Sequence, residues 1–510
     1  MLQNLKDFIK EHKKAILLNV VMVCICYIHM VFIQNVGIDT EVAIKDTPSL
    51  FGGWNSIGRQ GLVLTKILLK LTQYNPYFAG VIFLTGFILL GILTAFLCWI
   101  ASGKNSNYPY GLFMVLFSTS SVWMNQFYFA LQRAEVVLGL IYVVISVFSL
   151  CQILFYKNRK LYWIAAYLIF GVWSFCSYQG CVMFYIALCI VFFLMDFMRT
   201  CREKQWKEYS VLILQLISGF MVIYLVNMAI TKLFFGQGDY LQNQIGWGKM
   251  ETSQILHNMY DHVKSILLCR GMQNRSAYPF ACLCIALLFV GFCLKREIKK
   301  SLKVLLFLAL AGLMATPFLL TIYLGNIPVP RSQFALQLVS AFSCMFAYGI
   351  WKMEGRQNYK FMSHGIIVVS CMIVWFSLST IFRLQYTDDM RYQQDVRVAC
   401  EIAEELQETE GAQGLPVIFV GGYVSNLNAS TRGTDMYGYS FLGWDYHAGN
   451  LVGATGRIEG FMKTLGIDIP VTTKYQDKAI KTAKKMACYP KPGYISVQDK
   501  FVVVKLSEIN

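Results

Sequence analysis

Two carboxylates stand two residues apart in the stretch NVGIDTEVAI, residues 35–44, directly after an apolar run that ends near Ile33. They are Asp39 and Glu41. A carboxylate held next to a reacting hydroxyl can accept its proton as a general base. A loop acid at such a place can equally be solvated and inert. The chemistry of the pair therefore depends on which side of a membrane it faces and on which groups face the same way.

Three arginines lie in short polar segments between apolar runs: Arg59, Arg133 and Arg331. A guanidinium is always charged and can bind a phosphate or a carboxylate through two parallel hydrogen bonds. Arg331 follows the sequence IPVP, a rigid loop that would hold its side chain in place. The three arginines are candidates for binding an anion. For Arg133, a structural ion pair with Glu135 is the alternative.

His257, Asp261 and His262 have the spacing of metal ligands on a helix, but no H-E-x-x-H motif is present. A polar face on a surface helix is the favoured interpretation. The chain has 16 cysteines, most of them inside apolar runs, where they act as small hydrophobic residues. The two C-x-C pairs have no accompanying histidine or further cysteine. We therefore expect no metal.

The elements that must position these residues are membrane helices. Of the 510 residues 56% are hydrophobic and only 15% are charged, whereas soluble domains carry about 25% charged residues. Uncharged runs such as 81–100 and 211–230 are long enough to cross a bilayer as helices. The composition predicts a polytopic α-helical membrane protein, surrounded by membrane lipids, whose N-terminal apolar run is an uncleaved first span.

We predict about eleven spans, or ten or twelve if the fifth and sixth are a re-entrant pair. They cover residues 15–33, 77–101, 109–130, 134–156, 161–176, 179–198, 209–234, 276–295, 302–325, 332–351 and 361–383. Cytoplasmic loops carry an excess of lysine and arginine. With the N-terminus inside, the inner segments hold 20 such residues, and the three short outer loops hold only Arg133 and Arg331. Cytoplasmic loops thus account for the net charge of +16, without a nucleic acid partner.

This orientation divides the chain into a membrane-embedded domain, 1–383, and an external α/β domain, 384–510. It also places two loops outside, 34–76 and 235–275. The external domain is inferred from an amphipathic helix, a buried strand, a second helix and a hairpin, over residues 395–408, 415–423, 479–490 and 494–506. The N-terminus would be cytoplasmic and the C-terminal domain extracellular.

The first external loop ends in a candidate interfacial helix. Over 61–71 the apolar residues stand at 62, 64, 67, 68, 69 and 71, and Lys66 and Lys70 stand four apart. This pattern predicts a helix in the membrane surface with its lysines toward water or lipid headgroups. Pro48 and the glycine pair 52–53 are expected to break the segment before it.

Taken together, the acids after the first span, the interfacial helix, the many spans and the C-terminal external domain resemble the GT-C membrane glycosyltransferases. The stretch 37–71 resembles more narrowly the Gtr-type glucosyltransferases, which add glucosyl groups to bacterial surface polysaccharide. In that family's pattern an acid is followed by an aromatic residue, a Gly-Arg pair and an apolar helix. The matching residues here are Asp39, Trp54, Gly58-Arg59 and Leu62–Leu71.

The sequence departs from the family's pattern in one respect. The family's acids are expected as adjacent aspartates, whereas here Thr40 separates Asp39 from Glu41. Which of the two acids does the chemistry stays open.

The resemblance implies transfer of a hexose, in this family glucose, at the outer face of a bacterial plasma membrane. Nucleotide sugars are absent there, so the donor would be a polyprenyl-phosphate sugar and the acceptor a surface glycan. The transfer needs a carboxylate for the hydroxyl proton, a cation for the leaving phosphate and an apolar groove for the lipid. Asp39 is the candidate base, and Glu41 could take that role or orient the acceptor. Arg59, Arg133 and Arg331 are the candidates for the phosphate.

Other residues of the outer segments could contact the sugars. Trp54 could stack on a sugar ring, and Tyr178 and Gln179 lie at a predicted outer turn. Packing is the alternative for each, because aromatic residues are common at membrane interfaces. No metal or other cofactor is expected, since one phosphate carries less charge than a diphosphate.

Three other functions are alternatives. A transporter or lipid flippase usually places charged residues or broken helices at mid-membrane, whereas the predicted span interiors are nearly free of charge. A polysaccharide polymerase or ligase would use a diphosphate-linked oligosaccharide, carry its main loop late in the chain and need no carboxylate in the first loop. A non-enzymatic scaffold is the remaining alternative.

Overall fold

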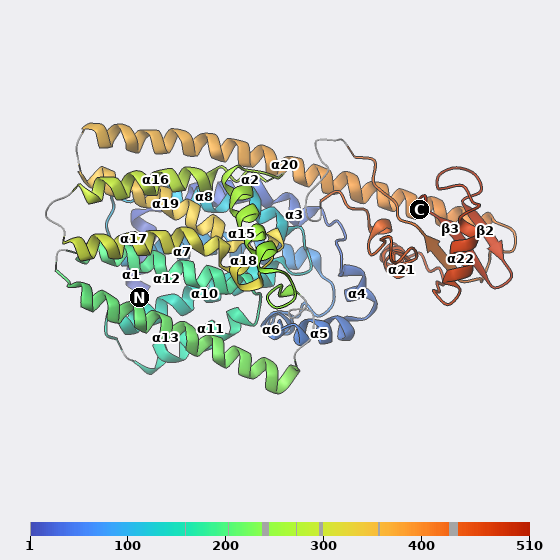
Figure 1. Ribbon diagram of the computed structural model, residues 1–510, viewed down its shortest axis with the longest axis horizontal. Helices are drawn as coiled ribbons and strands as arrows, with labels where there is room; N and C mark the ends of the chain where they lie inside the picture. The colour runs from blue at the N-terminus through green and yellow to red at the C-terminus, as the bar shows by residue number, and fades with distance from the viewer. Residues whose placement is uncertain are drawn as a thin grey trace.

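The computed structural model describes residues 2–158, 160–201, 203–236, 244–271, 273–294, 299–354, 357–427 and 437–509. Parts of the predicted inner segments, at 159, 202, 295–298 and 355–356, lie outside the described residues. The molecule has a bundle of long helices and a small α/β domain beyond one end of the bundle (Figure 1). The N-terminus lies on the bundle and the C-terminus in the small domain.

The described helices, in chain order, fall into three groups. The N-terminal segment and first loop contain α1 (Leu2–Glu11), α2 (Lys13–Tyr27), α3 (His29–Phe32), α4 (Thr40–Lys45), α5 (Thr47–Ser56) and α6 (Gln60–Leu68). The bundle continues with α7 (Pro76–Ala101), α8 (Tyr110–Ser118), η1 (Ser121–Trp123), α9 (Met124–Phe127), α10 (Arg133–Leu154), α11 (Leu161–Phe175), α12 (Gly180–Thr200), α13 (Trp206–Ile230) and the π-helix η2 (Thr231–Phe235). Next come α15 (Thr252–Leu267), α16 (Ala277–Cys293), α17 (Lys300–Ala315), η3 (Thr316–Phe318), α18 (Leu319–Leu324), η4 (Pro330–Ser332), α19 (Phe334–Glu354) and α20 (Gln357–Glu408).

Seven of the described helices are long and apolar enough to cross a membrane. They are α7, α10, α12, α13 with η2, α17 through α18, α19 and the 360–408 part of α20. Two shorter apolar helices, α11 and α16, accompany them. The length and composition of these helices are those of a polytopic membrane protein.

Some of the eleven predicted spans change conformation within the described residues. The span 302–325 passes from α17 through the 3-10 turn η3 to α18. The span 15–33 is divided between α2 and α3 at Ile28. The span 109–130 ends as a helix at Ser118 and continues through the short turns η1 and α9. At this point the Thr119 hydroxyl donates to the carbonyl of Val115, 2.8 Å away. Such side-chain bonds can bend a helix, and the four consecutive hydroxyl residues 118–121 mark this point in the sequence.

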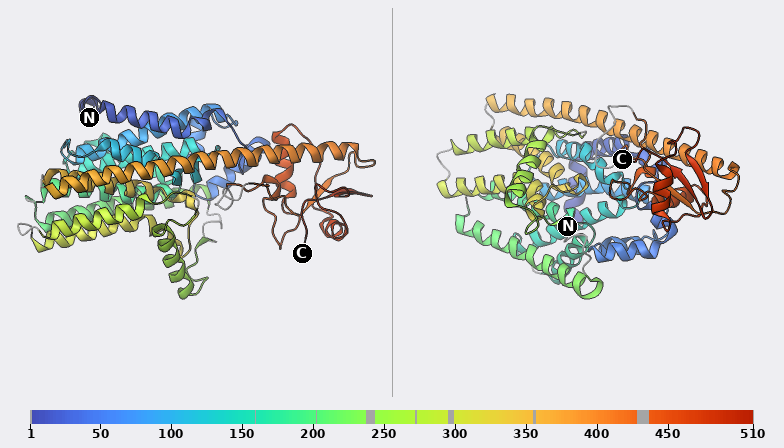
Figure 2. Two further views of the ribbon diagram at one scale, coloured as in Figure 1. Left: turned by 90° about the horizontal axis from the view of Figure 1, so that it is seen from above. Right: turned by 45° about the vertical axis from the view of Figure 1, so that its right-hand side comes forward.

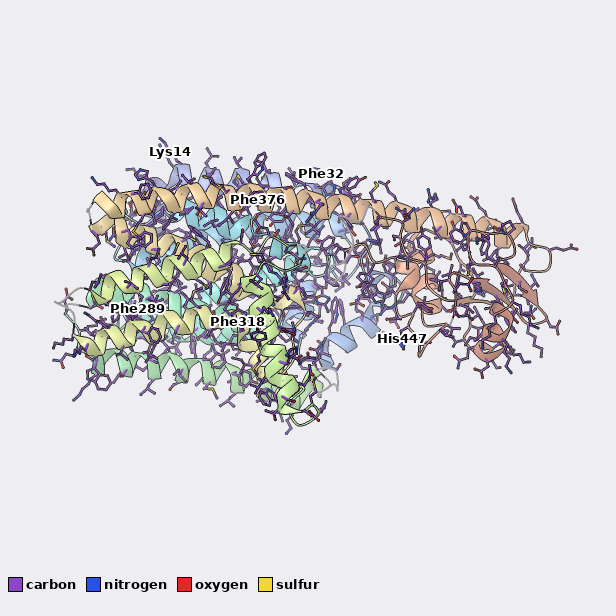
Figure 3. The ribbon with its side chains drawn as sticks, turned by 45° about the horizontal axis from the view of Figure 1, so that its top comes forward. Lys14, Phe32, Phe289, Phe318, Phe376 and His447 are labelled. Atoms are coloured by element: carbon purple, nitrogen blue, oxygen red, sulfur yellow. The ribbon has the colours of Figure 1, made fainter. Side chains whose placement is uncertain are left out.

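The bundle is layered around α19. In the apolar stretch of α19, 94% of the residues are buried, whereas in the apolar stretch of α13 with η2 only 11% of the residues are buried. Phe32 and Phe376 are exposed on the outer surface of the bundle (Figure 3). Exposed aromatic side chains of this kind fit a hydrocarbon surrounding better than water.

The two ends of the bundle are formed by different elements. α17 begins and α19 ends away from the small domain, whereas α4, α5 and α6 lie at the end of the bundle that faces it, with α4 closest (Figure 1). α20 runs along the bundle and continues into the small domain (Figure 2). The helix is unbroken at residue 384, where the sequence predicts the external part to begin. The last membrane helix therefore carries the small domain directly.

A buried arginine fixes the point where α20 leaves the bundle. Arg391 binds Asp388 at 2.7 Å and Asp395 at 3.3 Å. It also donates to the carbonyl of Val36, in the first loop, at 3.2 Å. The small domain is thus connected to the first loop as well as to α20.

The small domain has a three-stranded sheet of order β1–β3–β2. Its elements are β1 (Val417–Val420), η6 (Phe441–Gly443), α21 (Thr455–Thr464), α22 (Gln476–Ala483), β2 (Ile495–Gln498) and β3 (Phe501–Lys505). β1 is parallel to β3, and β2 is antiparallel to it. The predicted buried strand and hairpin are confirmed. The predicted helix 479–490 is offset, because α22 already ends at Ala483.

The first loop differs from its prediction in the burial of one lysine. Helix α6 forms as expected, but Lys66 is buried and binds Glu135 at 2.7 Å. The prediction that Lys66 faces water is wrong. Glu135 is buried at the start of α10 and a buried carboxylate needs a counterion. Lys70 is exposed, as expected.

The predicted break before α6 is also wrong. Pro48 lies in the first turn of α5, a position that tolerates the missing N–H. The glycine pair 52–53 lies inside this helix. Asp46 caps its N-terminus by accepting from the backbone N–H of Ser49 at 3.1 Å. Capping therefore outweighs the weak helix propensity of the glycines.

Candidate active site

The two acids of the first loop lie in different environments. Asp39 precedes α4 in the left-handed backbone region, with φ +69°, which aspartate visits more readily than most residues. Its side chain is 35% exposed. Glu41, in the first turn of α4, is only 3% exposed. One acid is open to solvent and the other is buried.

An arginine of the small domain binds both acids. On α21, Arg457 Nη1 hydrogen-bonds to Glu41 and lies 3.5 Å from Asp39 Oδ1, and Nε donates to Asp445 at 2.7 Å. A Cβ at Gly460 would lie 2.6 Å from Glu41 Cγ, so the close approach of α4 and α21 requires glycine there. The first loop and the small domain meet at this ion cluster.

Glu41 is less accessible than Asp39, because its side chain is only 3% exposed. Burial raises the pKa of Glu41, which by itself favours proton uptake, and the positive charge of Arg457 opposes that shift. The carboxylate is already bonded to Arg457 on one oxygen. Asp39, which is 35% exposed and not bonded so closely, is the more accessible of the two acids.

A cavity of about 530 Å³ brings Asp39 together with three arginines. They are Arg59 from the start of α6, Arg331 from η4 and Arg457 from α21. The wall also contains Ile38, Val42, Ser49, Leu50, Gly53, Trp54, Ile57, Phe129, Gln132 and Trp444. The volume is within the range of small-ligand sites. A solvent-accessible carboxylate and several guanidinium groups therefore share one cavity.

Aromatic rings hold two of the cavity's arginines. The Arg59 guanidinium lies 4.7 Å from the centre of the Tyr178 ring, and its Nη1 donates to Gln132 at 3.3 Å. The Arg331 guanidinium lies 4.8 Å from the centre of the Phe129 ring. Cation–π contacts at such distances stabilise the position of the charge. Both guanidinium groups are therefore held at the wall of the cavity, where an anionic group can bind.

The family model for the glucosyl transferase GtrII matches residues 12–348. The chain belongs to this family. Neither the comparison with curated proteins nor the comparison with solved structures found a match. The family is one of glucosyl transferases, which makes the chain a glycosyltransferase. Of the cavity residues, Asp39, Arg59 and Arg331 lie inside the matched region of the GtrII-family protein, and Arg457 lies beyond it.

Of the three residues predicted to contact sugars, Trp54 lines the cavity, whereas Tyr178 and Gln179 do not. Trp54 lines the cavity and stacks on Phe51, with ring centres 5.9 Å apart. Tyr178 is buried beneath Arg59 and does not line the cavity. Gln179 also lies outside the cavity wall and donates to the carbonyl of Ile57 at 3.2 Å. Tyr178 thus supports an arginine of the GtrII-family site.

The third predicted arginine lies elsewhere. Arg133 is buried and donates to the carbonyl of Met30 at 2.6 Å and to Gln34 at 2.9 Å. It lines a separate cavity of about 30 Å³. The alternative of an Arg133–Glu135 pair is wrong, because Glu135 binds Lys66. The structure brings together Arg59 and Arg331 but not Arg133.

The histidines of α15 lie on two faces. His257 and Asp261 are exposed and pair at 3.0 Å. His262 is buried, 2.6 Å from Thr321 Oγ1 and 2.5 Å from Gln333 Nε2. The interpretation as a polar surface face holds for the first two residues only. Over the described ranges, no group of three or more His, Cys, Asp or Glu side chains could hold a metal ion.

Sequence reasoning missed the contribution of the small domain. Arg457, Trp444 and Asp445 lie about 400 residues after Asp39 in ordinary polar stretches. No local spacing links them to the first loop. The tertiary contact between α4 and α21 alone places them in the GtrII-family site.

Proposed function

We propose that this GtrII-family protein transfers a glucosyl group from a polyprenyl-phosphate sugar to a hydroxyl of a cell-surface glycan, at the outer face of a bacterial plasma membrane. One observation carries the proposal: Asp39, Arg59 and Arg331 line the same cavity. The reaction needs a base and cations for a phosphate, and the cavity supplies these groups.

In the proposed step, a lone pair of the acceptor hydroxyl forms a bond to the anomeric carbon of the donor sugar. The bond between that carbon and the phosphate oxygen breaks, and its electron pair leaves with polyprenyl phosphate. Asp39 accepts the hydroxyl proton. Arg59 and Arg331 stabilise the negative charge of the leaving phosphate. Trp54 and Trp444 line the cavity and would contact the sugar.

Glu41 and Arg133 have other roles in this proposal. Glu41 is buried and bonded to Arg457, so it holds that arginine beside Asp39. Arg133 bonds two groups near the end of α3 and lies away from the cavity. We therefore assign the base role to Asp39 alone and the donor phosphate to Arg59 and Arg331.

The arrangement of the ends supports an outer-face reaction. The first loop, η4 and the small domain contribute to one cavity. The lysine- and arginine-rich segments adjoin helix ends on the far side of the bundle, and such segments remain in the cytoplasm. The N-terminus would be cytoplasmic and the small domain extracellular, in a GT-C-like multi-pass enzyme. A flippase would place its charged groups at mid-membrane, not at one end.

The proposal is tested by sugar transfer with purified protein in lipid, radiolabelled polyprenyl-phosphate glucose and a glycan acceptor. Asp39→Asn should lower turnover by a factor of about 10²–10⁴ while donor binding is kept, because general base catalysis contributes this much. Arg331→Ala should weaken donor binding. The controls are Asp261→Asn and Arg397→Ala, which alter half-exposed or exposed members of surface ion pairs.

Two outcomes would contradict the proposal. Turnover that survives Asp39→Asn would move the base role to another acid, such as Glu41. No transfer from any monophosphate donor, with lipid flipping detected in its place, would reject the transferase reaction in this form.

A further inference from the structure

A second cavity, of about 470 Å³, lies against the same ion cluster. α4 forms one side of it, and α21 with the segment 445–453 forms the other. Asp39 and Arg457 line both this cavity and the first one. The candidate base is therefore accessible from two cavities, which have different walls.

The second cavity has the opposite charge balance from the first. Its wall contains the acids Asp39, Glu41, Asp46 and Asp445 and the cations Lys45 and Arg457. Neither Arg59 nor Arg331 lines it. Four carboxylates around two cations repel a phosphate and accept hydrogen bonds from hydroxyl groups. The wall favours a neutral ligand that is rich in hydroxyls.

Glycines form the wall on the α21 side: Gly453, Gly456 and Gly460. At two of them a side chain would clash with the protein, with Asp445 O 2.1 Å from a Cβ at 453 and Glu41 Cγ 2.6 Å from one at 460. A Cβ at Gly456 would meet no atom of the described residues within 4 Å. Packing therefore does not require glycine at 456, and the missing side chain leaves room in the cavity.

A buried polar atom of the wall lacks a partner. Glu41 is 3% exposed, and among the described residues its Oε2 atom has no hydrogen-bond partner, although Oε1 is bonded to Arg457. An unsatisfied buried acceptor costs about 1–3 kcal/mol. A ligand hydroxyl at this wall can satisfy it, so the orphan oxygen points independently to a hydroxyl-bearing ligand.

We infer that the second cavity binds the acceptor saccharide, a neutral chain of sugars, and presents one of its hydroxyls to Asp39. The inference rests on the proposed function and assigns the first cavity to the lipid-phosphate donor. Donor and acceptor then reach Asp39 from different cavities. The hydroxyl gives its proton to Asp39 as its oxygen bonds to the anomeric carbon and polyprenyl phosphate leaves. Arg457 is a positioning residue, which holds Glu41 in the acceptor wall and stands beside Asp39.

Filling each cavity separately tests this assignment in the full-length protein in lipid. Gly456→Phe would obstruct the second cavity and Gly53→Phe the first, since a Cβ at Gly53 also meets no atom within 4 Å in the part of the chain that the structure describes. Gly52→Phe is the matched control, because Gly52 is equally open but lines neither cavity. The series Gly456→Ala, Leu and Phe varies the size of the obstruction, and thermal unfolding verifies that each variant is folded.

The probes are radiolabelled polyprenyl-phosphate glucose and oligosaccharides released from the surface polysaccharide of the cell that makes the protein. We expect Gly456→Phe to raise the KM for the oligosaccharide at least tenfold with unchanged donor binding, and the smaller side chains to have graded effects. Gly53→Phe should weaken donor binding, and Gly52→Phe should change neither. An unchanged oligosaccharide KM in folded Gly456→Phe, or a loss of donor binding like that of Gly53→Phe, would overturn the inference.

Direct binding separates this inference from the proposed function. Oligosaccharide binding to wild type and Gly456→Phe can be measured by saturation-transfer NMR without a donor. Wild type that binds the oligosaccharide but does not use polyprenyl-phosphate glucose would reject the proposed donor. Loss of that binding in Gly456→Phe would still support the second cavity as the acceptor site, and its persistence would overturn it.

Discussion

Arg457 binds Glu41 and Asp445 and lies next to Asp39. Arg457→Ala would leave the Glu41 carboxylate buried and without its counterion, which typically costs about 3–5 kcal/mol. Because Arg457 is 24% exposed, we expect a loss of about 3 kcal/mol in the free energy of unfolding, measured by denaturant titration in detergent.

Two further variants make this stability prediction specific. The double variant Arg457→Ala/Glu41→Gln should regain part of the loss, because no buried charge remains. Arg397→Ala removes an exposed pair with Glu401 and should cost less than about 1 kcal/mol. A loss for Arg457→Ala no larger than that of Arg397→Ala would show that the buried pair does not stabilise the protein.

Site residues that lie close together in the sequence could be predicted, and those that lie far apart could not. Asp39, Trp54 and Arg59 fall within one short loop and line one cavity, so their order along the chain predicted their grouping. Arg331 was predicted from its proline-rich loop. Arg457 gives no such signal, because its partners lie about 400 residues away and only the fold brings their charges together.

Among the elements, η4 carries Arg331 and is joined to α15 by a buried histidine. Gln333, just after η4, donates its amide to His262 Nε2, so Nδ1 carries the hydrogen and donates to Thr321. A protonated Nε2 would face the Gln333 donor. Burial, with the positive charge of Arg275, lowers the pKa of His262 to about 4. The neutral ring is thus part of what holds this segment against α15.

This contact predicts a pH-dependent stability. The folded-state pKa lies below the ordinary 6.5, so the unfolded chain binds the proton more tightly and stability falls as pH falls from about 6.5 to 4. The loss should approach about 3 kcal/mol, at 1.36 kcal/mol for each pKa unit. Thermal unfolding across this range should show a smaller fall for His262→Gln than for wild type. His257→Gln, which alters an exposed histidine, should follow wild type, and equal slopes in all three would contradict the prediction.

Hydropathy predicted where most helices lie but not where they break or continue. The run 109–130 is apolar enough on average to predict one span, yet α8 ends at Ser118, where the hydroxyl residues 118–121 begin. In α20 the reverse holds, because the side chains become polar after 384 while the backbone ladder continues to Glu408. Where a helix passes from lipid into water, its residue types change from apolar to polar, but its backbone geometry stays the same.

For the whole molecule, the separation of the two bundle ends predicts which residues are accessible from outside the cell. Lys45, in the first loop, and Lys300, at the start of α17, are both exposed. We expect a membrane-impermeant maleimide to label Lys45→Cys on intact cells and to label Lys300→Cys only after the cells are opened. Wild type gives the background of its 16 cysteines. The reverse pattern would place the site in the cytoplasm.

The position of the family match along the chain has a consequence for inheritance. The matched region, 12–348, contains Asp39, Arg59 and Arg331, whereas the glycine wall of the second cavity belongs to α21 and the segment before it. If that wall selects the acceptor, one part of the gene encodes the residues that bind the donor, and the part that follows encodes the residues that select the acceptor. Recombination after α19 would then keep the lipid donor and the base and give the enzyme a new polymer to decorate.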